Sequence, residues 1–126
     1  MKRNLNLIRK ILLDIENAPP GKVISASNFN YEEFEELIIV EHLKLLVDAK
    51  LLEGNVIEDS LFDGSIVSAC FIHRLTWDGH EFLANAKNDT IWKKVTSQAE
   101  EKGESISIFV LNQLLASATK KYLGLD

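Results

Sequence analysis

The chain has 126 residues, with 14 basic and 19 acidic side chains and a formal net charge of −5. This length suits one domain with a substantial core, and the acidic balance disfavours nonspecific binding of nucleic acid or anionic membranes by the whole molecule. The single cysteine excludes an internal disulfide, and no apolar run is long enough for a membrane span. We expect a cytoplasmic protein with a single domain over residues 1–126, comprising a core over 1–87 and a helical extension over 88–126.

The first predicted element is an amphipathic helix. Apolar residues recur at helical spacing from Leu5 to Ile15, and Asn4 is suited to be its N-cap. The Pro-Pro-Gly sequence at residues 19–21 ends this helix, because proline lacks the amide that a helix needs. The β-branched segment Lys22–Ser27 predicts a short strand.

The segment from Tyr31 to Lys50 keeps an apolar rhythm of three to four residues. It fits one helix, or two consecutive helices with a tight turn near residues 35–38, with Asn28 or Asn30 as N-cap. A helix-turn-helix requires the second option. No glycine or proline between residues 22 and 53 marks such a turn, so both options stay open.

Two strands are predicted next, over Asn55–Ile57 and Ile66–Leu75, and Thr76 is placed to cap a helix from Trp77 to about Ala86. The order of helix, two strands and helix is typical of a winged helix-turn-helix. We therefore predict an α+β fold, mostly helical, with a β-hairpin wing and extra C-terminal helices. The predicted wing tip carries turn-forming residues, which are Asp59, Ser60, Asp63, Gly64 and Ser65.

Two helices are predicted in the C-terminal extension. Asn88 or Asp89 caps the first, which ends at Gly103, and Ser107 caps the second. The last helix has a wide apolar surface over residues 106–123. This surface either covers the core or forms the seam of a homodimer.

Several phrases of the sequence occur together in a known family. They are MKRNLNLIRKILLDIE, EHLKLLVDAKLLEG, RLTWDGHEFL followed by DTIWKKV, and the closing LGL. The chain resembles the domain of unknown function family 2513, small uncharacterised bacterial and phage proteins that are themselves similar to YjcQ-like winged-helix proteins. The resemblance implies a winged-helix fold and a phage, prophage or mobile-element setting, but no activity and no functional residues.

The charges on the predicted recognition helix disfavour the usual role of this fold. From residue 31 to 50 there are six acidic and two basic residues, a net charge of −4, whereas a helix that reads DNA needs Arg, Lys, Asn or Gln on its exposed face. The exposed positions define a candidate partner-binding face, with a plain solvated helix face and base readout as the alternatives. The face consists of Glu36, Glu41, His42, Lys44 and Asp48.

The predicted wing is acidic as well. Glu58, Asp59 and Asp63 lie between residues 54 and 68, where no Lys or Arg occurs, and wings that touch DNA normally carry a basic residue. The candidate phosphate-contacting residues lie elsewhere, and the alternative for them is a solvated helix face. They are Lys2, Arg3, Arg9 and Lys10.

The sequence offers no recognisable catalytic or metal site. The spacings of Cys70 and the three histidines match no zinc template, and Cys70 and His73 would point to opposite faces of one strand. No nucleophile elbow or Gly-rich phosphate loop occurs. We therefore expect no enzyme activity, no metal and no cofactor. We interpret Trp77 and Trp92 as core anchors, with an interface hot spot as the alternative for either.

Together these patterns predict a non-catalytic protein-interaction or regulatory module. The expected partner is another protein or a second copy of the chain, with no membrane and no small-molecule substrate. The alternative is a winged-helix transcriptional regulator, although the acidic helix and wing disfavour double-stranded DNA.

Overall fold

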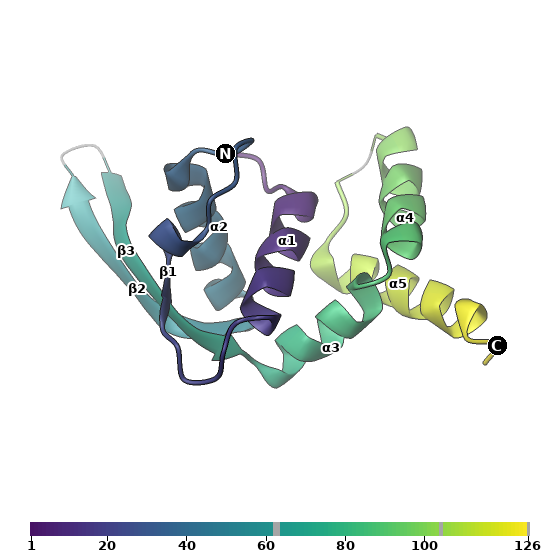
Figure 1. Cartoon of the computed structure of the whole chain (residues 1–126). Coiled ribbons are helices and arrows are strands. Elements are labelled where there is room, and N and C mark those ends of the chain that lie inside the picture. The colour runs from purple at the N-terminus through teal and green to yellow at the C-terminus, as the bar shows by residue number, and fades with distance from the viewer. Residues whose placement is uncertain (62–63, 104, 126) are drawn as a thin grey trace. The chain divides into compact units, whose positions relative to one another are not determined.

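The computed structural model describes residues 1–61, 64–103 and 105–125 and has a helix-rich α+β fold (Figure 1). The chain forms two compact units, Met1–His80 and Glu81–Asp126, which we call the N-terminal and C-terminal units. None of the described helices is long and apolar enough to cross a membrane. The elements are α1 (Leu5–Glu16), β1 (Ile24–Ser25), the 3-10 helix η1 (Ala26–Asn28), α2 (Glu36–Asp48), β2 (Leu52–Leu61), β3 (Gly64–Leu75), α3 (Trp77–Ala86), α4 (Asp89–Glu101) and α5 (Ile108–Tyr122).

Helix α1 forms as predicted. The side chain of Asn4 accepts a hydrogen bond from the backbone N–H of Leu7 at 2.9 Å, which satisfies one of the unpaired donors at the start of the helix. Its apolar stripe is buried in the N-terminal unit and comprises Leu7, Ile8, Ile11, Leu12 and Ile15.

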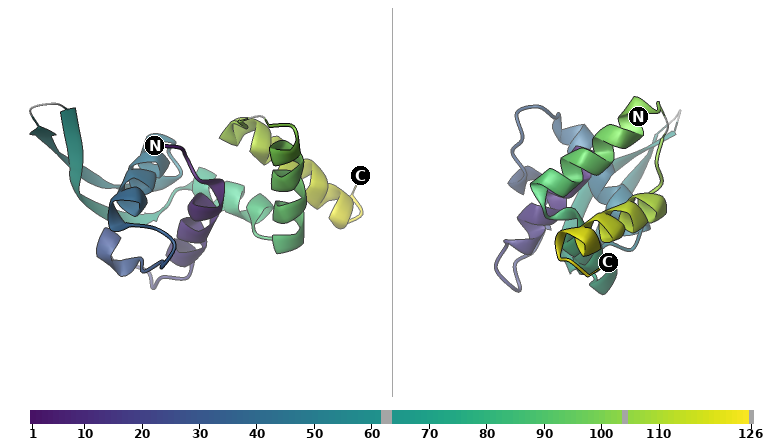
Figure 2. Two further views of the ribbon diagram at one scale, coloured as in Figure 1. Left: turned by 90° about the horizontal axis from the view of Figure 1, so that it is seen from above. Right: turned by 90° about the vertical axis from the view of Figure 1, so that its right-hand side faces the viewer.

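The three strands form an antiparallel sheet in the order β1-β3-β2, and β2 and β3 make a long hairpin beside α2 (Figures 1 and 2). The short first strand was predicted and pairs with β3 through Ile24 and Ile72. The predicted turn was too long, because Asp59, Ser60, Gly64 and Ser65 continue the strands. Antiparallel backbone pairing here prevails over the turn tendency of Asp and Ser. The remaining predicted turn former, Asp63, lies outside the described residues.

Helix α2 is a single helix from Glu36 to Asp48, so the predicted start at Tyr31 is wrong. Tyr31 is instead held by a hydrogen bond from its hydroxyl to Asp14, and its ring centroid lies 6.1 Å from that of Phe29. The acidic side chains at residues 32, 33, 35 and 36 would also repel one another at helical spacing. Asn28 and Asn30 therefore cap no helix at Tyr31, and the Asn28 side chain accepts a hydrogen bond from the backbone of Ser25.

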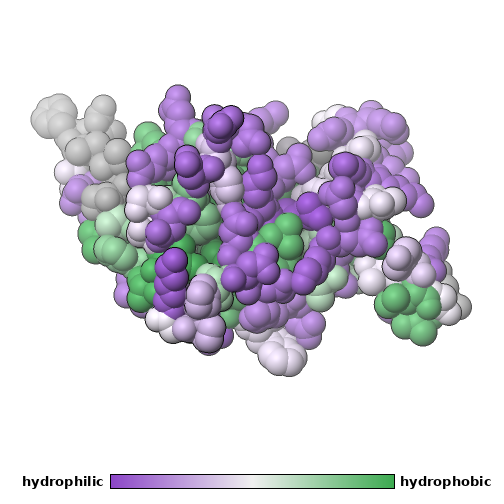
Figure 3. Space-filling view, viewed as in Figure 1, coloured by the Kyte–Doolittle hydropathy of each residue, from purple (hydrophilic) through white to green (hydrophobic). Residues whose placement is uncertain are grey.

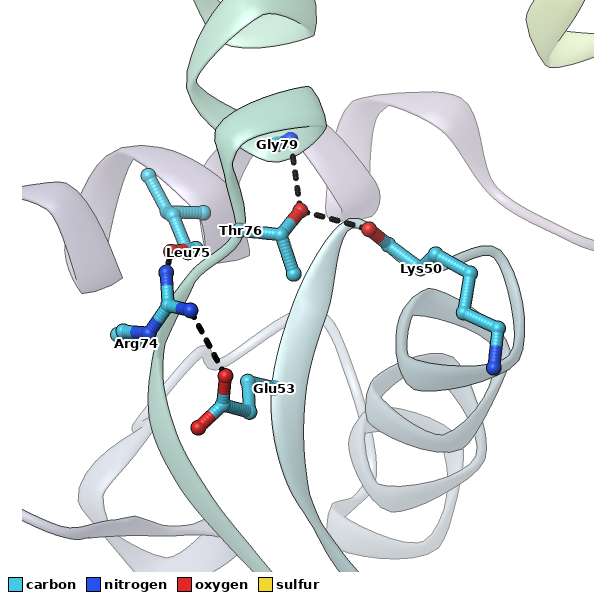
Figure 4. Close-up of polar contacts among 6 residues, drawn as sticks. All are labelled: Lys50, Glu53, Arg74, Leu75, Thr76 and Gly79. Carbon is cyan, nitrogen blue, oxygen red and sulfur yellow. Dashed lines mark hydrogen bonds and ion pairs between the residues drawn. The ribbon is translucent and has the colours of Figure 1, made fainter.

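The end of α2 is joined to the start of α3 by a compact polar network (Figure 4). Lys50 has a left-handed backbone with φ of 64°, and Leu51 donates to Leu46 across the helix end, which is a Schellman motif. The Thr76 hydroxyl donates to the Lys50 carbonyl at 2.6 Å and accepts from the Gly79 N–H at 3.0 Å. Thr76 therefore caps α3, as predicted, and also ties it to α2.

Gly79 lets α3 approach this network closely. A Cβ atom added at Gly79 would lie 2.1 Å from the carbonyl oxygen of Leu51. Trp77 begins the same helix but lies about 200° around it from Gly79, and 76% of it is exposed. The interpretation of Trp77 as a core anchor is therefore wrong, because α3 packs against Leu51 with its glycine side.

The C-terminal unit contains two helices with the predicted caps. The Asn88 side chain accepts from the Ile91 N–H at 3.0 Å, and the Ser107 hydroxyl accepts from the Val110 N–H at 3.1 Å. Trp92 is buried, as predicted. Helix α5 is also held to the last turns of α3, where the Asn85 amide donates to the Asn112 side chain at 3.0 Å.

Candidate interaction surface of the N-terminal unit

The predicted face of α2 is mostly acidic where it meets solvent. Glu36 and Asp48 are exposed, whereas Glu41 and Lys44 are half-buried. Glu36 lies in the first turn of the helix, where the helix dipole favours an acidic side chain. Four of the five predicted residues thus reach the surface, and three of the four carry a negative charge.

His42 is the exception, and its assignment to the partner-binding face is wrong. Its side chain is fully buried. The ring Nε2 accepts a hydrogen bond from the backbone N–H of Asn4 at 2.8 Å, and Nδ1 donates to the carbonyl of Ile38 at 2.8 Å. Position 42 lies three residues after Ile39 and four before Leu46, both buried, so the helical spacing itself places it on the inner side.

Lys44 is joined to the neighbouring hairpin. Its ammonium group forms an ion pair with the carboxylate of Glu58 on β2. The hydrogen bond to Glu58 is the main cause that raises the pKa of Lys44 above its ordinary value, and the charges of Asp48 and Glu41 add to it. The one cation of α2 is therefore partly neutralised by a residue of the predicted wing.

A second cation, Arg74 of the hairpin, is also paired with an acidic side chain of β2. Arg74 on β3 donates to Glu53 on β2 at 2.8 Å and to the carbonyl of Leu75 at 2.9 Å (Figure 4). Glu53 lies directly across the ladder from Arg74, so the pair connects neighbouring strands. Both ion pairs are near the surface and supply little stability. Because they engage the cations Lys44 and Arg74, the unpaired charges left on α2 are mainly acidic.

Three of the four predicted phosphate-contacting residues are exposed to solvent. Lys2 and Arg3 are exposed and precede α1, and Arg9 is half-buried. Lys10 pairs with Glu33 at 3.1 Å and lies 5.1 Å from the ring centroid of Tyr31. The hydrogen bond from Lys10 is the main cause that lowers the pKa of Glu33. This pairing weakens the attraction of Lys10 for phosphate.

A cleft of about 530 Å³ lies beside the loop that follows α1. It brings together the side chains of Lys22, His73, Arg74 and His80. None of its described lining residues is a serine, threonine or cysteine, so it offers no hydroxyl or thiol nucleophile.

No described group of three or more His, Cys, Asp and Glu side chains is placed to hold a metal ion. Cys70 and His73 point to opposite sides of β3, as predicted, with Cys70 buried and His73 exposed. Burial raises the pKa of the Cys70 thiol, which makes it a poor nucleophile.

Comparison with known proteins assigns the chain to a family. Residues 2–105 match the profile of a family described as hypothetical protein (DUF2513). The chain belongs to this family. It is also 31% identical over 124 residues to an uncharacterized protein of Haemophilus influenzae, which covers 98% of this chain and the whole of that relative. The resemblance to this family seen in the sequence is thus confirmed. No solved structure matches the chain.

The DUF2513 match covers the N-terminal unit, α3 and α4, and it ends before α5. It therefore includes the RLTWDGHEFL phrase, residues 74–83, whose structural meaning is now clear. Thr76 and Gly79 of this phrase make the joint between α2 and α3, and Arg74 connects the hairpin strands (Figure 4). These three residues of the phrase thus have structural roles in the N-terminal unit.

Proposed function

We propose that the protein is a non-catalytic binding module with a winged-helix framework, which docks a basic surface of another protein. The order α1-β1-η1-α2-β2-β3 supports this framework, with η1 in the place of a full second helix and the β2–β3 hairpin as the wing. A regulatory role in a phage, prophage or mobile element belongs to the same proposal and rests on the family resemblance.

One observation carries the proposal, namely the pairing of Lys44 with Glu58. In a DNA-binding winged helix, the exposed cations of the recognition helix and wing face phosphate. Here the only cation of α2 is joined to a wing carboxylate, while Glu36 and Asp48 remain exposed. This surface repels phosphate and attracts Lys and Arg side chains of a partner.

Exposed apolar side chains near these charges support a protein partner. Leu37 on α2 is 48% exposed and Ile57 on β2 is 49% exposed. Protein interfaces combine apolar contacts of this kind with a polar rim.

The proposal is tested with single charge reversals on the full chain. Glu36→Lys and Glu41→Lys each change a side chain of the α2 face, and Glu81→Lys makes the same charge change on an exposed residue of α3. We expect a protein captured by the wild type to be retained by Glu81→Lys and bound several-fold more weakly by the other two variants. Equal capture by all three variants would refute a docking role for this face.

The second candidate function is DNA binding, which the winged-helix order and the exposed Lys2 and Arg3 favour. Its test is binding to random duplex DNA at about 50 mM and about 200 mM salt. Micromolar binding that collapses at the higher salt and weakens in a Lys2→Ala/Arg3→Ala variant would support it over the protein-binding proposal. We expect no binding at either salt concentration.

A further inference from the structure

Helix α5 presents exposed apolar side chains on the flank of its buried side, facing the groove beside α4. Leu111 and Leu115 are fully buried within the C-terminal unit, whereas Val110 is 43% exposed and Leu114 is 45% exposed. In the space-filling view a small apolar cluster is visible beside the C-terminal half of α5, and the rest of the surface around it is mostly hydrophilic or neutral (Figure 3). Monomeric proteins rarely leave contiguous apolar surface of this kind uncovered, and it often marks an interaction site.

This surface borders a groove between α4 and α5, which we call the α4–α5 groove. Its volume is about 760 Å³. Its apolar walls are formed by Val95, Ala99, Ile106, Val110 and Leu114. Glu101 and Lys102, at the end of α4, and Ser107, the N-cap of α5, also line it. The groove is therefore apolar along its length and charged at the end where α5 begins.

The spacing along α5 gives the exposed stripe the form of a helix-pairing seam. Ser107, Leu114 and Lys121 are seven residues apart, and Val110 and Ser117 fall between them at steps of three and four. Residues at this spacing lie along one side of a helix and can meet the same stripe of a neighbouring helix. A second copy of α5 is thus a suitable occupant, because its stripe has the same pattern.

The charges determine the direction of such a pair. Lys120 and Lys121 are exposed in the last turn of α5, while Glu100 and Glu101 are exposed at the end of α4, close in sequence to the first turn of α5. In an antiparallel pair centred on Leu114, Lys121 of one copy lies at the level of Ser107 of the other, because each is seven residues from Leu114. Glu101 and Lys102 line the groove at that end, and with the exposed Glu100 the acidic side chains of these three residues outnumber the basic one. A parallel pair would instead bring like charges together.

We propose that the α4–α5 groove is a self-association site, in which a second copy of the chain lays its α5 antiparallel across the groove with two-fold symmetry. The contact is isologous, so each Lys121 meets the Glu101 region of the other copy and each Leu114 packs against its counterpart. The inference is independent of the proposed function, since it uses the C-terminal unit alone.

Sedimentation of the full-length protein over a range of micromolar concentrations tests the proposal. We expect the wild type to reach twice the mass of the 14.2 kDa chain, and Leu114→Glu to remain monomeric with an unchanged circular dichroism spectrum. The matched control is Val23→Glu, which places the same charge on an apolar side chain of similar exposure in the N-terminal unit, outside both proposed surfaces. This variant should dimerise like the wild type.

A charge exchange tests the antiparallel arrangement. Lys121→Glu and Glu101→Lys should each weaken dimerisation several-fold, and the double variant should recover most of it because the pair is restored with its charges exchanged. A wild type that stays monomeric at every concentration would overturn the proposal. Equal effects of Val23→Glu and Leu114→Glu would overturn it too, and a double variant weaker than both single variants would overturn the antiparallel arrangement.

Discussion

Leu43 on α2 and Leu114 on α5 lie near the middle of helices of 13 and 15 residues, yet Leu43 is fully buried and Leu114 is 45% exposed. Helix α2 contacts α1, η1 and both long strands, so its inner side is enclosed. Helix α5 has its main contact with α4. Within the C-terminal unit, other elements therefore cover only one side of α5.

The same contrast holds for polar groups. In the N-terminal unit a buried histidine has both ring nitrogens hydrogen-bonded, and a glycine allows two backbones to approach closely. In the C-terminal unit the side-chain hydrogen bonds include the helix caps, two from the Thr96 hydroxyl to backbone carbonyls and the Asn85–Asn112 pair. Tight closure should make the N-terminal unit sensitive to small substitutions, and the exposed side of α5 in the C-terminal unit is the surface on which we propose association. Matched substitutions in the two units test this difference.

The largest effect is expected for Gly79→Ala. The added Cβ would lie 2.1 Å from the Leu51 carbonyl oxygen, so α3 must move away and break the Thr76 bonds. We expect a loss of about 4 kcal/mol or more in the free energy of unfolding, measured by urea denaturation. The matched variant is Gly103→Ala, where no heavy atom lies within 4 Å and only the positive φ of 65° opposes a side chain. Its cost should be about 1 kcal/mol, and equal losses at the two glycines would contradict the contrast.

A smaller effect is expected for His42→Ala. The change removes a fully buried ring and leaves the Asn4 N–H without its acceptor, for a loss of about 3 kcal/mol. Asn112→Ala is the counterpart in the C-terminal unit, where a half-buried amide loses one bond to Asn85, and its cost should be about 1 kcal/mol. Thermal unfolding followed by circular dichroism measures both. If His42→Ala lost no more stability than Asn112→Ala, the buried histidine would not be stabilising the N-terminal unit as its two hydrogen bonds suggest.

The two capping hydroxyls provide a third comparison. Thr76→Ala loses the cap of α3 and the 2.6 Å bond to the Lys50 carbonyl, so we expect a cost of about 2 kcal/mol. Ser107→Ala loses only the cap of α5, at about 1 kcal/mol. Thr76→Ser retains the hydroxyl and should recover most of the loss. Denaturant titration measures the free energy of unfolding of the three variants. A cost for Thr76→Ala no larger than that for Ser107→Ala would contradict the role of Thr76 at the junction of α2 and α3.

Much of this fold was predictable because its signals are local. The caps at Asn4, Thr76 and Ser107 and the apolar stripe of α1 depend on residues three or four positions apart, and each was confirmed. The start of α2 was not predictable in the same way. Tyr31 is held outside the helix by Asp14, a residue 17 positions earlier, so the deciding contact exists only after folding.

The candidate surface likewise combines features that the sequence shows directly with features that depend on the fold. The acidic character of α2 is a property of composition and was visible in the sequence, whereas the pairing of Lys44 with Glu58 depends on how the hairpin returns beside the helix. His42 was assigned to the exposed face because histidine is polar, although its spacing from Ile39 and Leu46 already indicated burial. Trp77 was assigned to the core because tryptophan is large, but the close approach of Gly79 to Leu51 turns that side of α3 inward instead.

The smallest effect is expected at alkaline pH and belongs to the N-terminal unit. Burial raises the pKa of Cys70 from its ordinary value of 9.0, and burial together with Asp14 raises the pKa of Tyr31. Since the unfolded chain loses these protons first, the stabilisation is complete below pH 9.0 and declines as the pH rises through the folded pKa values. The free energy of unfolding should therefore fall on raising the pH above this value, less steeply in Cys70→Ala and less steeply still with Tyr31→Phe added.

A thiol reagent should correspondingly modify Cys70 slowly until the unit unfolds, because the chain must open to release the thiolate. Rapid modification in native conditions would show that the sheet opens readily, and the contrast between a closed and an open unit would then fail at the single cysteine of the chain.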